Sequence, residues 1–245
     1  MSTDNVQLIG DVARTSTGDV VDGGMTYATF DRNRALMVRQ AESYSRIDRG
    51  QYFTVGSTPG TGLAGHAAAT TLDNTKPFVW LMSNYTASDG KRIYLDYMKT
   101  WVTAAGTNGT DLRYAIKTDT ATTRRTSAGT ALTATQVSQQ SSVAASVTGY
   151  AGAIVAAAAT GSVKTITHGL LRTVINVVGD EYLFTFGRRA GTAVGMPTEG
   201  TLQLKAQFEC PGVVLGPTDQ FLFHFFSTAQ SAASSHEVEI GFWVA

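Results

Sequence analysis

A glycine pattern near residue 60 is the first feature of the sequence that could bind a ligand. Gly60, Gly62 and Gly65 have the GxGxxG spacing of dinucleotide sites. In those sites the glycines lie at a strand-to-helix turn, and the helix N-terminus faces the pyrophosphate. Strands are predicted at 51–55 and 77–83, which leaves no room for a crossover helix after the glycines. The sequence therefore favours an ordinary loop over a nucleotide site.

Histidine and cysteine are the next residues whose chemistry could serve a site. None of the four histidines stands at the i, i+2 or i+4 spacing of a local metal pair, although distant histidines could still meet in space or across a symmetry axis. His224 lies in a very apolar stretch, which favours a hydrogen-bonded structural histidine. The single cysteine, Cys210, can form neither an intrachain disulfide nor a paired zinc motif. The other histidines are His66, His168 and His236.

The residue types of hydrolase active sites are present, but the sequence motif that usually carries the catalytic serine is missing. Serine, histidine and acidic residues are all present, but the sequence has no GxSxG turn. We interpret Asp180 and Glu181 as a turn, and Glu237 and Glu239 as a solvated strand face, because paired catalytic carboxylates need concave surroundings. We therefore predict no catalytic residues, no cofactor-binding residues and no metal ligands, and we expect that the chain is not an enzyme.

The composition limits the partners that the chain can have. Of the 245 residues, 43% are hydrophobic and only 16% are charged, against about 25% charged in an average protein. Lys and Arg total 19, as do Asp and Glu, so the net charge is zero. Without a surplus of positive charge we expect no nucleic-acid partner. We also expect no membrane partner, because no stretch approaches the ~18 apolar residues of a membrane span.

Alternating apolar and polar residues predict strands over most of the chain after residue 50. Residues 118–140 are predicted to be long surface loops with one short strand, and 143–159 a strand despite its alanines. Asp89-Gly90 predicts a type I′ hairpin turn. Because no helices alternate with these strands, we predict an all-β fold, an antiparallel β-sandwich or jelly roll. Further strands are predicted at 91–102, 112–116, 170–178, 182–186, 202–209, 220–226 and 236–244.

The alternation of residue types also predicts which side chains share a face in two of these strands. In the strand from residue 91, Ile93, Leu95 and Tyr97 are expected on one face, opposite Arg92, Tyr94 and Asp96. The strand 220–226 is apolar on both faces. Because a lone sandwich covers only one of these faces, we expect an inter-subunit contact to cover the other.

The first 50 residues differ from the rest of the chain. They are rich in charged residues, and their apolar residues form only short clusters such as Val20-Val21. We predict an extended N-terminal arm over 1–50, which needs a partner surface because it can bury little by itself. The alternative is that the arm packs against its own domain. The predicted organisation is thus an arm, 1–50, and a jelly-roll-like β-domain, 51–245.

Three segments together resemble a known group of proteins. They are 56–65 (GSTPGTGLAG), 90–97 (GKRIYLDY) followed by 103–107 (TAAGT), and 230–243 (QSAASSHEVEIGFW). These phrases are similar to tailed-bacteriophage proteins that are found among virion structural genes, and the resemblance spans about residues 50–245. It gives no catalytic residue to carry over.

The resemblance implies a non-enzymatic capsid cement or decoration protein with a jelly-roll-like fold. It also implies a homotrimer that binds the major capsid protein or another virion protein, within a virion assembled in the host cytoplasm. The alternative is a tail or head fibre or receptor-binding module, which should show repeats or coiled-coil heptads that the sequence lacks. A lectin-like domain would present aromatic residues in loops, whereas Trp80, Trp101 and Trp243 fall in predicted strands.

Overall fold

The protein is described by a computed structural model of residues 1–245. The residues whose structure is described are 29–30, 36–37, 46–47, 49–107, 109, 111–120, 124–138, 144–159, 161–173, 176–187, 204–227 and 230–245. Almost all of the predicted β-domain is therefore described. Most of the predicted arm lies outside the described residues.

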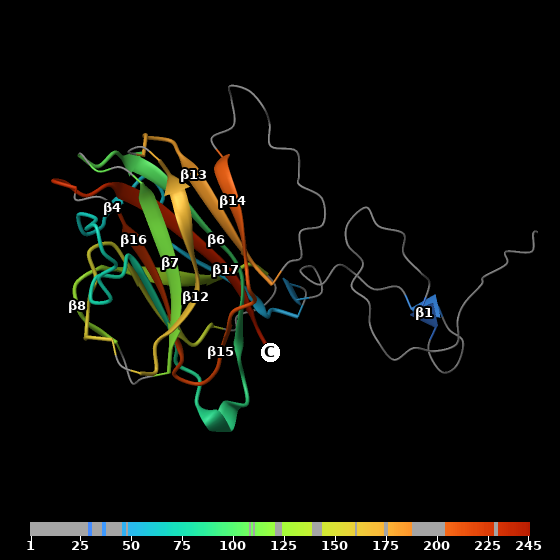
Figure 1. The fold of residues 1–245 in the computed structure, drawn as a ribbon. Helices are drawn as coiled ribbons and strands as arrows, with labels where there is room; N and C mark the ends of the chain where they lie inside the picture. Colours follow the sequence, from blue (N-terminus) through green and yellow to red (C-terminus); the bar gives the residue numbers. More distant parts are fainter. Residues whose placement is uncertain are drawn as a thin grey trace, which may run out of the picture.

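Thirteen strands form one large sheet that folds over on itself into two layers. They follow the order β12-β7-β16-β5-β10-β9-β3-β17-β6-β13-β14, with β15 paired to β6 and β4 to β17. Figure 1 shows β7 and β12 crossing in front of β6 and β17. The strands are β3 (Tyr52–Gly56), β4 (Leu63–Ala64), β5 (Val79–Ser83), β6 (Ile93–Ala104), β7 (Leu112–Asp119), β9 (Thr130–Gln136), β10 (Val147–Ala151), β12 (Lys164–Arg172), β13 (Glu181–Phe186), β14 (Leu204–Cys210), β15 (Val214–Leu215), β16 (Gln220–Phe226) and β17 (Ser235–Val244).

Strand β9 is the corner between the two layers. Its first half, Thr130 to Leu132, pairs with β10, and its second half, Thr133 to Gln136, pairs with β3. The pairs in the sheet are antiparallel except for β13 and β14, which run parallel. At the opposite side β12 and β14, the two ends of the strand order, contact each other, so the sheet is nearly closed. The predicted all-β, sandwich-like fold is confirmed.

Aromatic side chains fill the space between the layers. Tyr114 and Phe223 from one layer meet Phe184 and Phe208 from the other, with ring centroids 4.9 to 5.2 Å apart across the two layers. Such edge-to-face and offset pairs add to the free energy gained by burying apolar area. Among the described residues, the core cluster runs from Phe53 to Val244.

The structure corrects three predictions about local elements. Asp89-Gly90 does not join a hairpin: Thr86 and Asp89 form a capping box around the 3₁₀ helix η1 (Ala87–Asp89), which projects at the bottom of Figure 1. The strands on either side, β5 and β6, belong to different layers. The strand predicted at 170–178 lies instead at Lys164–Arg172 and leaves Val177 and Val178 exposed. Residues 118–140 hold two strands, β9 and β8 (Arg125–Ser127), the second paired with β11 (Val155–Ala156).

The outer face of β16 is covered by its own chain, contrary to the prediction. Leu222 is 1% exposed and packs with Trp80 and Ile154. Tyr150 and Met82 complete this second apolar cluster. Because the chain itself supplies the cover, β16 gives no reason to expect an inter-subunit contact at this face.

The described parts of the predicted arm are a pair of short strands and a helical turn. The strands β1 (Thr29–Phe30) and β2 (Leu36–Met37) pair with each other in a sheet of their own. A helical turn ends where the amide of Gln51 bonds to the carbonyl of Arg46 and that of Gly50 to the carbonyl of Ile47. Gly50 has φ +65°, so these bonds form a Schellman motif directly before β3. The sequence also allows a helical turn or two near 33–43, but the described residues of that range, Leu36 and Met37, form strand β2.

Candidate functional site

The glycine-rich segment 60–65 packs closely against strands β6 and β17. Residues 63–64 form β4, which pairs with β17, and residues 65–71 hold no helix. A Cβ atom on Gly62 would lie 1.9 Å from Oγ1 of Thr103, so a side chain cannot fit there. Residues 57–62 form a loop as predicted, whereas Leu63 and Ala64 form a short strand. The glycines allow close backbone approach to β6 and β17.

The structure brings Ser234 and His236 into a hydrogen bond, with Oγ 2.8 Å from Nε2. The sequence analysis did not single out this pair. His236 is fully buried and stacks on Phe225, with centroids 4.6 Å apart, while its Nδ1 lies 3.4 Å from Oγ1 of Thr100. Burial lowers the pKa of His236 to about 3, so the ring stays neutral. Because Ser234 is also buried, this pair stabilises the core and offers no nucleophile to a substrate.

His224 belongs to a second buried polar cluster, on the outer face of β7 and β16. Its pKa falls to about 4, first because of burial and then because of the positive charge of Lys117. Lys117 donates to Oδ1 of Asn74, and burial also lowers the pKa of Lys117. Arg124 lies 3.5 Å from Asp119, and both side chains are buried. The predicted structural role of His224 fits, but its two ring nitrogens lack good hydrogen-bond partners.

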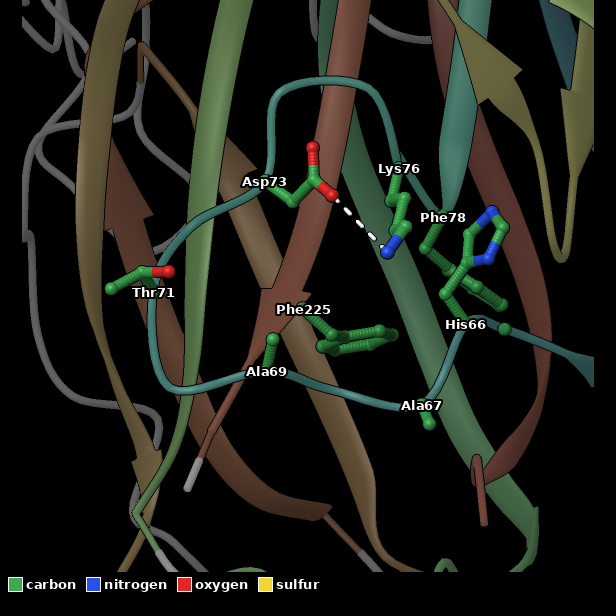
Figure 2. Close-up of a pocket in the computed structure, with 9 residues that line it drawn as sticks. His66, Ala67, Ala69, Thr71, Asp73, Lys76, Phe78 and Phe225 are labelled. Atoms are coloured by element: carbon green, nitrogen blue, oxygen red, sulfur yellow. Dashed lines mark ion pairs between the residues drawn. The ribbon is translucent and has the colours of Figure 1, made fainter. Parts of the chain in front are cut away.

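A shallow pocket lies beside these clusters (Figure 2). His66 stands at one side of it, and Phe78 and Phe225 form its apolar wall. Asp73 and Lys76, which form an ion pair 3.2 Å apart, also line the pocket, and Lys76 lies next to His66 in the view. The enclosed space holds about one water molecule. This volume is too small for an organic substrate or cofactor.

Among the described residues, no three His, Cys, Asp or Glu side chains form a metal-binding group. Cys210 is buried, and burial raises the pKa of its thiol to about 11. His66 contacts the carbonyl of Ile154 through Nε2, at 2.7 Å. The described histidines and the cysteine are therefore engaged in separate places and do not share a site. Within the same described residues, no helix is long and apolar enough to cross a membrane.

The outer face of β3, β17, β6 and β13 carries a different set of side chains, which we call the acidic-aromatic face. In register across it, Tyr52 lies beside Trp243 and then Tyr94, and Glu237 lies beside Trp101 and then Glu181. Most of these side chains are half-buried in the single chain. The acidic-aromatic face comprises Tyr52, Tyr94, Asp96, Tyr97, Lys99, Trp101, Glu181, Glu237, Glu239 and Trp243.

A β-bulge places Tyr97 on this face. The register between β6 and β17 shifts at Leu95 to Tyr97, so Asp96 is an extra residue. Ile93 and Leu95 point into the core before the bulge, and Met98 points inward after it. The prediction that Tyr97 shares a face with Ile93 and Leu95 is therefore wrong. Strict alternation, which is all that the sequence offered, cannot reveal a bulge.

Hydrogen bonds and ring contacts order the side chains of the acidic-aromatic face. Tyr97 donates to Glu239 at 2.5 Å, and burial followed by this bond raises the pKa of Tyr97 well above its usual value. Tyr94 and Trp243 lie parallel, with centroids 5.8 Å apart and an interplanar angle of 5°. The ammonium of Lys99 lies 5.1 Å from the centroid of Trp101. The face thus presents fixed rings and carboxylates with one cation among them.

The chemistry of this face suits binding. Aromatic side chains supply large contact area at low entropic cost, and they are enriched where proteins meet. Four carboxylates, Asp96, Glu181, Glu237 and Glu239, outnumber the single cation Lys99, so the face favours a partner with positive charge. We therefore take the acidic-aromatic face as the candidate functional site. From the sequence, Glu237 and Glu239 were expected on a solvated strand face and Glu181 in a turn, whereas Glu181 is the first residue of β13.

No protein-family model, curated protein or solved structure matches this chain.

Proposed function

We propose that the protein is a non-enzymatic structural component of a tailed-phage virion, a capsid cement or decoration protein that binds across capsid subunits. In this proposal the protein binds the major capsid protein or another virion protein. It is located in the virion, and it forms a homotrimer. The trimer number and the virion come from the sequence resemblance of 56–65, 90–97 and 230–243. The structure contributes the reason to expect binding.

The acidic-aromatic face is the observation that carries this proposal. The outer face of the other layer is closed by its own loops, with Leu222 and His224 each 1% exposed. In the acidic-aromatic face, Tyr94, Trp101 and Trp243 remain half-buried in the single chain. The histidines that could act as bases, His224 and His236, are buried in neutral form. The accessible chemistry of the described residues is thus that of a binding surface.

Quantitative mass spectrometry of purified virions tests the proposal. A cement protein should be present at a copy number comparable with that of the major capsid protein. Heads that lack it should break at a lower temperature or osmotic stress, and the added protein should restore them. Absence of the protein from purified virions would overturn the proposal.

The second candidate is a fibre or receptor-binding module. The parallel rings of Tyr94 and Trp243 favour it, because flat aromatic faces also bind sugars. The copy number separates the two functions, since a fibre is present at a small fraction of the capsid protein. Glycan binding that is lost in Trp243→Ala would support this second candidate.

A further inference from the structure

We propose that the acidic-aromatic face binds the arginine-bearing segment 32–49 from the arm of a second copy of this chain. The inference rests on the proposed function only in that it takes the face as a protein interface. It names the occupant as this chain's own arm, supplied by a neighbour. In that arrangement, residues 1–28 of the arm are left to bind other proteins of the virion.

The first argument is the match of residue types. Every cation of residues 1–50 is an arginine, whereas the β-domain uses both lysine and arginine. Guanidinium groups stack on aromatic rings and bind carboxylates through two parallel hydrogen bonds. The acidic-aromatic face offers both partners side by side, as at Trp101, which lies in register between Glu181 and Glu237. Such a face recognises arginine better than it recognises lysine.

The second argument is charge. Segment 32–49 contains five arginines against Glu42 and Asp48, which leaves it a net charge of +3. The acidic-aromatic face has four carboxylates against Lys99, a net charge of −3. Glu181 and Glu239 are partly exposed, whereas Asp96 and Glu237 are buried and accept hydrogen bonds from Tyr52 and Gly60. Because the whole chain is neutral, this separation of charge makes copies attract each other through defined surfaces. The five arginines are Arg32, Arg34, Arg39, Arg46 and Arg49.

The third argument is position. The Schellman motif at Gly50 joins the arm directly to β3, whose first residue, Tyr52, belongs to the acidic-aromatic face. The arm therefore begins at the border of this face. The paired strands β1 and β2 form a sheet separate from the main sheet of their own chain. Arg32 and Arg34 lie between these two strands in the sequence, and the two strands pair with each other and not with a strand of the main sheet.

An arm that binds the face of a neighbour makes a head-to-tail contact. Contacts of this kind close into a ring when the rotation between copies allows it, and they form open filaments otherwise. A closed ring of three copies is consistent with the trimer that the resemblance implies. In such a ring every acidic-aromatic face is occupied, and every arm is used.

Crosslinking of the full-length protein tests the occupant directly. In the variant Arg34→Cys/Thr54→Cys, one thiol is in the arm and the other is on β3 between the carboxylates and rings of the face, which stay intact. The native Cys210 is buried with a raised pKa and does not compete. A flexible bis-maleimide linker should join different copies and give covalent dimers and trimers on a denaturing gel. The matched control is Arg34→Cys/Lys164→Cys, with Lys164 exposed on the other layer.

The outcomes separate the alternatives. Dimers and trimers that form at least ~10-fold faster than in the control support the inference, as expected for a high effective concentration of the paired thiols. A crosslink confined to single chains would place the arm on its own domain and overturn it. A yield no greater than that of the control would overturn it as well. Neither failure affects the virion copy number, which tests the proposed function separately.

A charge exchange checks the chemistry of the contact. Glu181→Arg should weaken association at least ~10-fold, because it removes a carboxylate and adds a repulsive charge. Adding Arg34→Glu to this variant should recover part of the affinity, measured by analytical ultracentrifugation. The circular dichroism spectrum of each variant must match that of the parent. A double variant that is weaker than both single variants would contradict the proposed pairing of charges.

Discussion

Two buried histidines link the stability of this protein to pH. His236 and His224 have pKa values of about 3 and about 4, lowered mainly by burial, against about 6.5 in an unfolded chain. Below pH 6.5 the unfolded state therefore binds protons that the folded state does not. Stability should fall as the pH drops from 6.5 towards 4, and it should not change with pH above 7 through these groups.

We expect a loss of about 2 kcal/mol for each of the two histidines between pH 7 and pH 5, because each lowered pKa unit corresponds to about 1.4 kcal/mol. Urea unfolding at the two pH values measures this loss. His236→Gln should reduce the pH dependence by about half, whereas His168→Gln, at an exposed position, should leave it unchanged. Equal pH dependence in parent and His236→Gln would contradict the assignment.

The folded state also depends on a buried ion pair between Asp119 and Arg124. Asp119 compensates Arg124 in a region that also contains Lys117, and all three side chains are buried. Ser162 donates a further hydrogen bond to Oδ1 of Asp119, at 2.5 Å. Asp119→Asn would leave two buried cations without their anion, and we expect it to cost about 3–5 kcal/mol of unfolding free energy.

The matched control for Asp119 is Asp73→Asn. Asp73 pairs with Lys76, but both side chains are more than a third exposed, so the same substitution should cost less than about 1 kcal/mol. Chemical denaturation midpoints compare the two variants. Similar losses in both would show that the buried pair has no special importance.

At the scale of elements, one bulge and one glycine shape the candidate site. The extra residue Asp96 turns Tyr97 outward, where its ring lies over Gly241 of β17. A Cβ atom at residue 241 would lie 2.2 Å from Cε1 of Tyr97 and 2.7 Å from the hydroxyl of Tyr52. The glycine is therefore needed for the rings to lie against the sheet.

We expect Gly241→Ala to destabilise the fold by about 1–3 kcal/mol, since the rings must move to admit the methyl group. Gly161→Ala is the control, because nothing lies within 4 Å of its added Cβ atom. Thermal unfolding followed by circular dichroism gives the comparison. The tyrosine fluorescence of Gly241→Ala should change as well, because Tyr97 and Tyr52 are displaced. Equal midpoints for both variants would argue against this packing.

The sequence predicted the strands with strong alternation and missed what depends on distant partners. The strands near 52–56, 79–83, 220–226 and 235–244 were recognisable from their own residues. The pairing of β5 with β10 and β16 rather than β6 was not, because Asp89-Gly90 has the composition of a hairpin turn. Helix capping by Thr86 competes with that turn and prevails.

The candidate site was less predictable than the fold. Glu237 and Glu239 were placed on a solvated strand face from their spacing. They do lie on one face, but Glu237 is buried and accepts a hydrogen bond from the amide of Gly60. Their neighbours Trp101 and Tyr97 come from β6, and only the register between the two strands reveals them. Polar residues at β7 and β16, such as Lys117 and His224, are buried by loops that the sequence does not place.

At the scale of the whole molecule, the β-domain contains its own core. In the part of the chain that the structure describes, every strand of the main sheet begins at Tyr52 or later, and the core cluster begins at Phe53. The three tryptophans, Trp80, Trp101 and Trp243, also lie within the main sheet. The stability of this domain should therefore depend little on the arm, whose contribution we assign to contacts between copies.

A chain reduced to residues 46–245 tests this division. It keeps the Schellman motif between Arg46 and Gln51 but loses three of the five arginines of segment 32–49. We expect an unchanged near-ultraviolet circular dichroism spectrum from the tryptophans and a monomer in light scattering. The full-length protein should associate, and its association should weaken as salt rises from 0.1 M, where the screening length is about 10 Å. A truncated chain with the same oligomeric state as the full chain would show that copies meet through another surface, and loss of its near-ultraviolet spectrum would show that the arm is part of the fold.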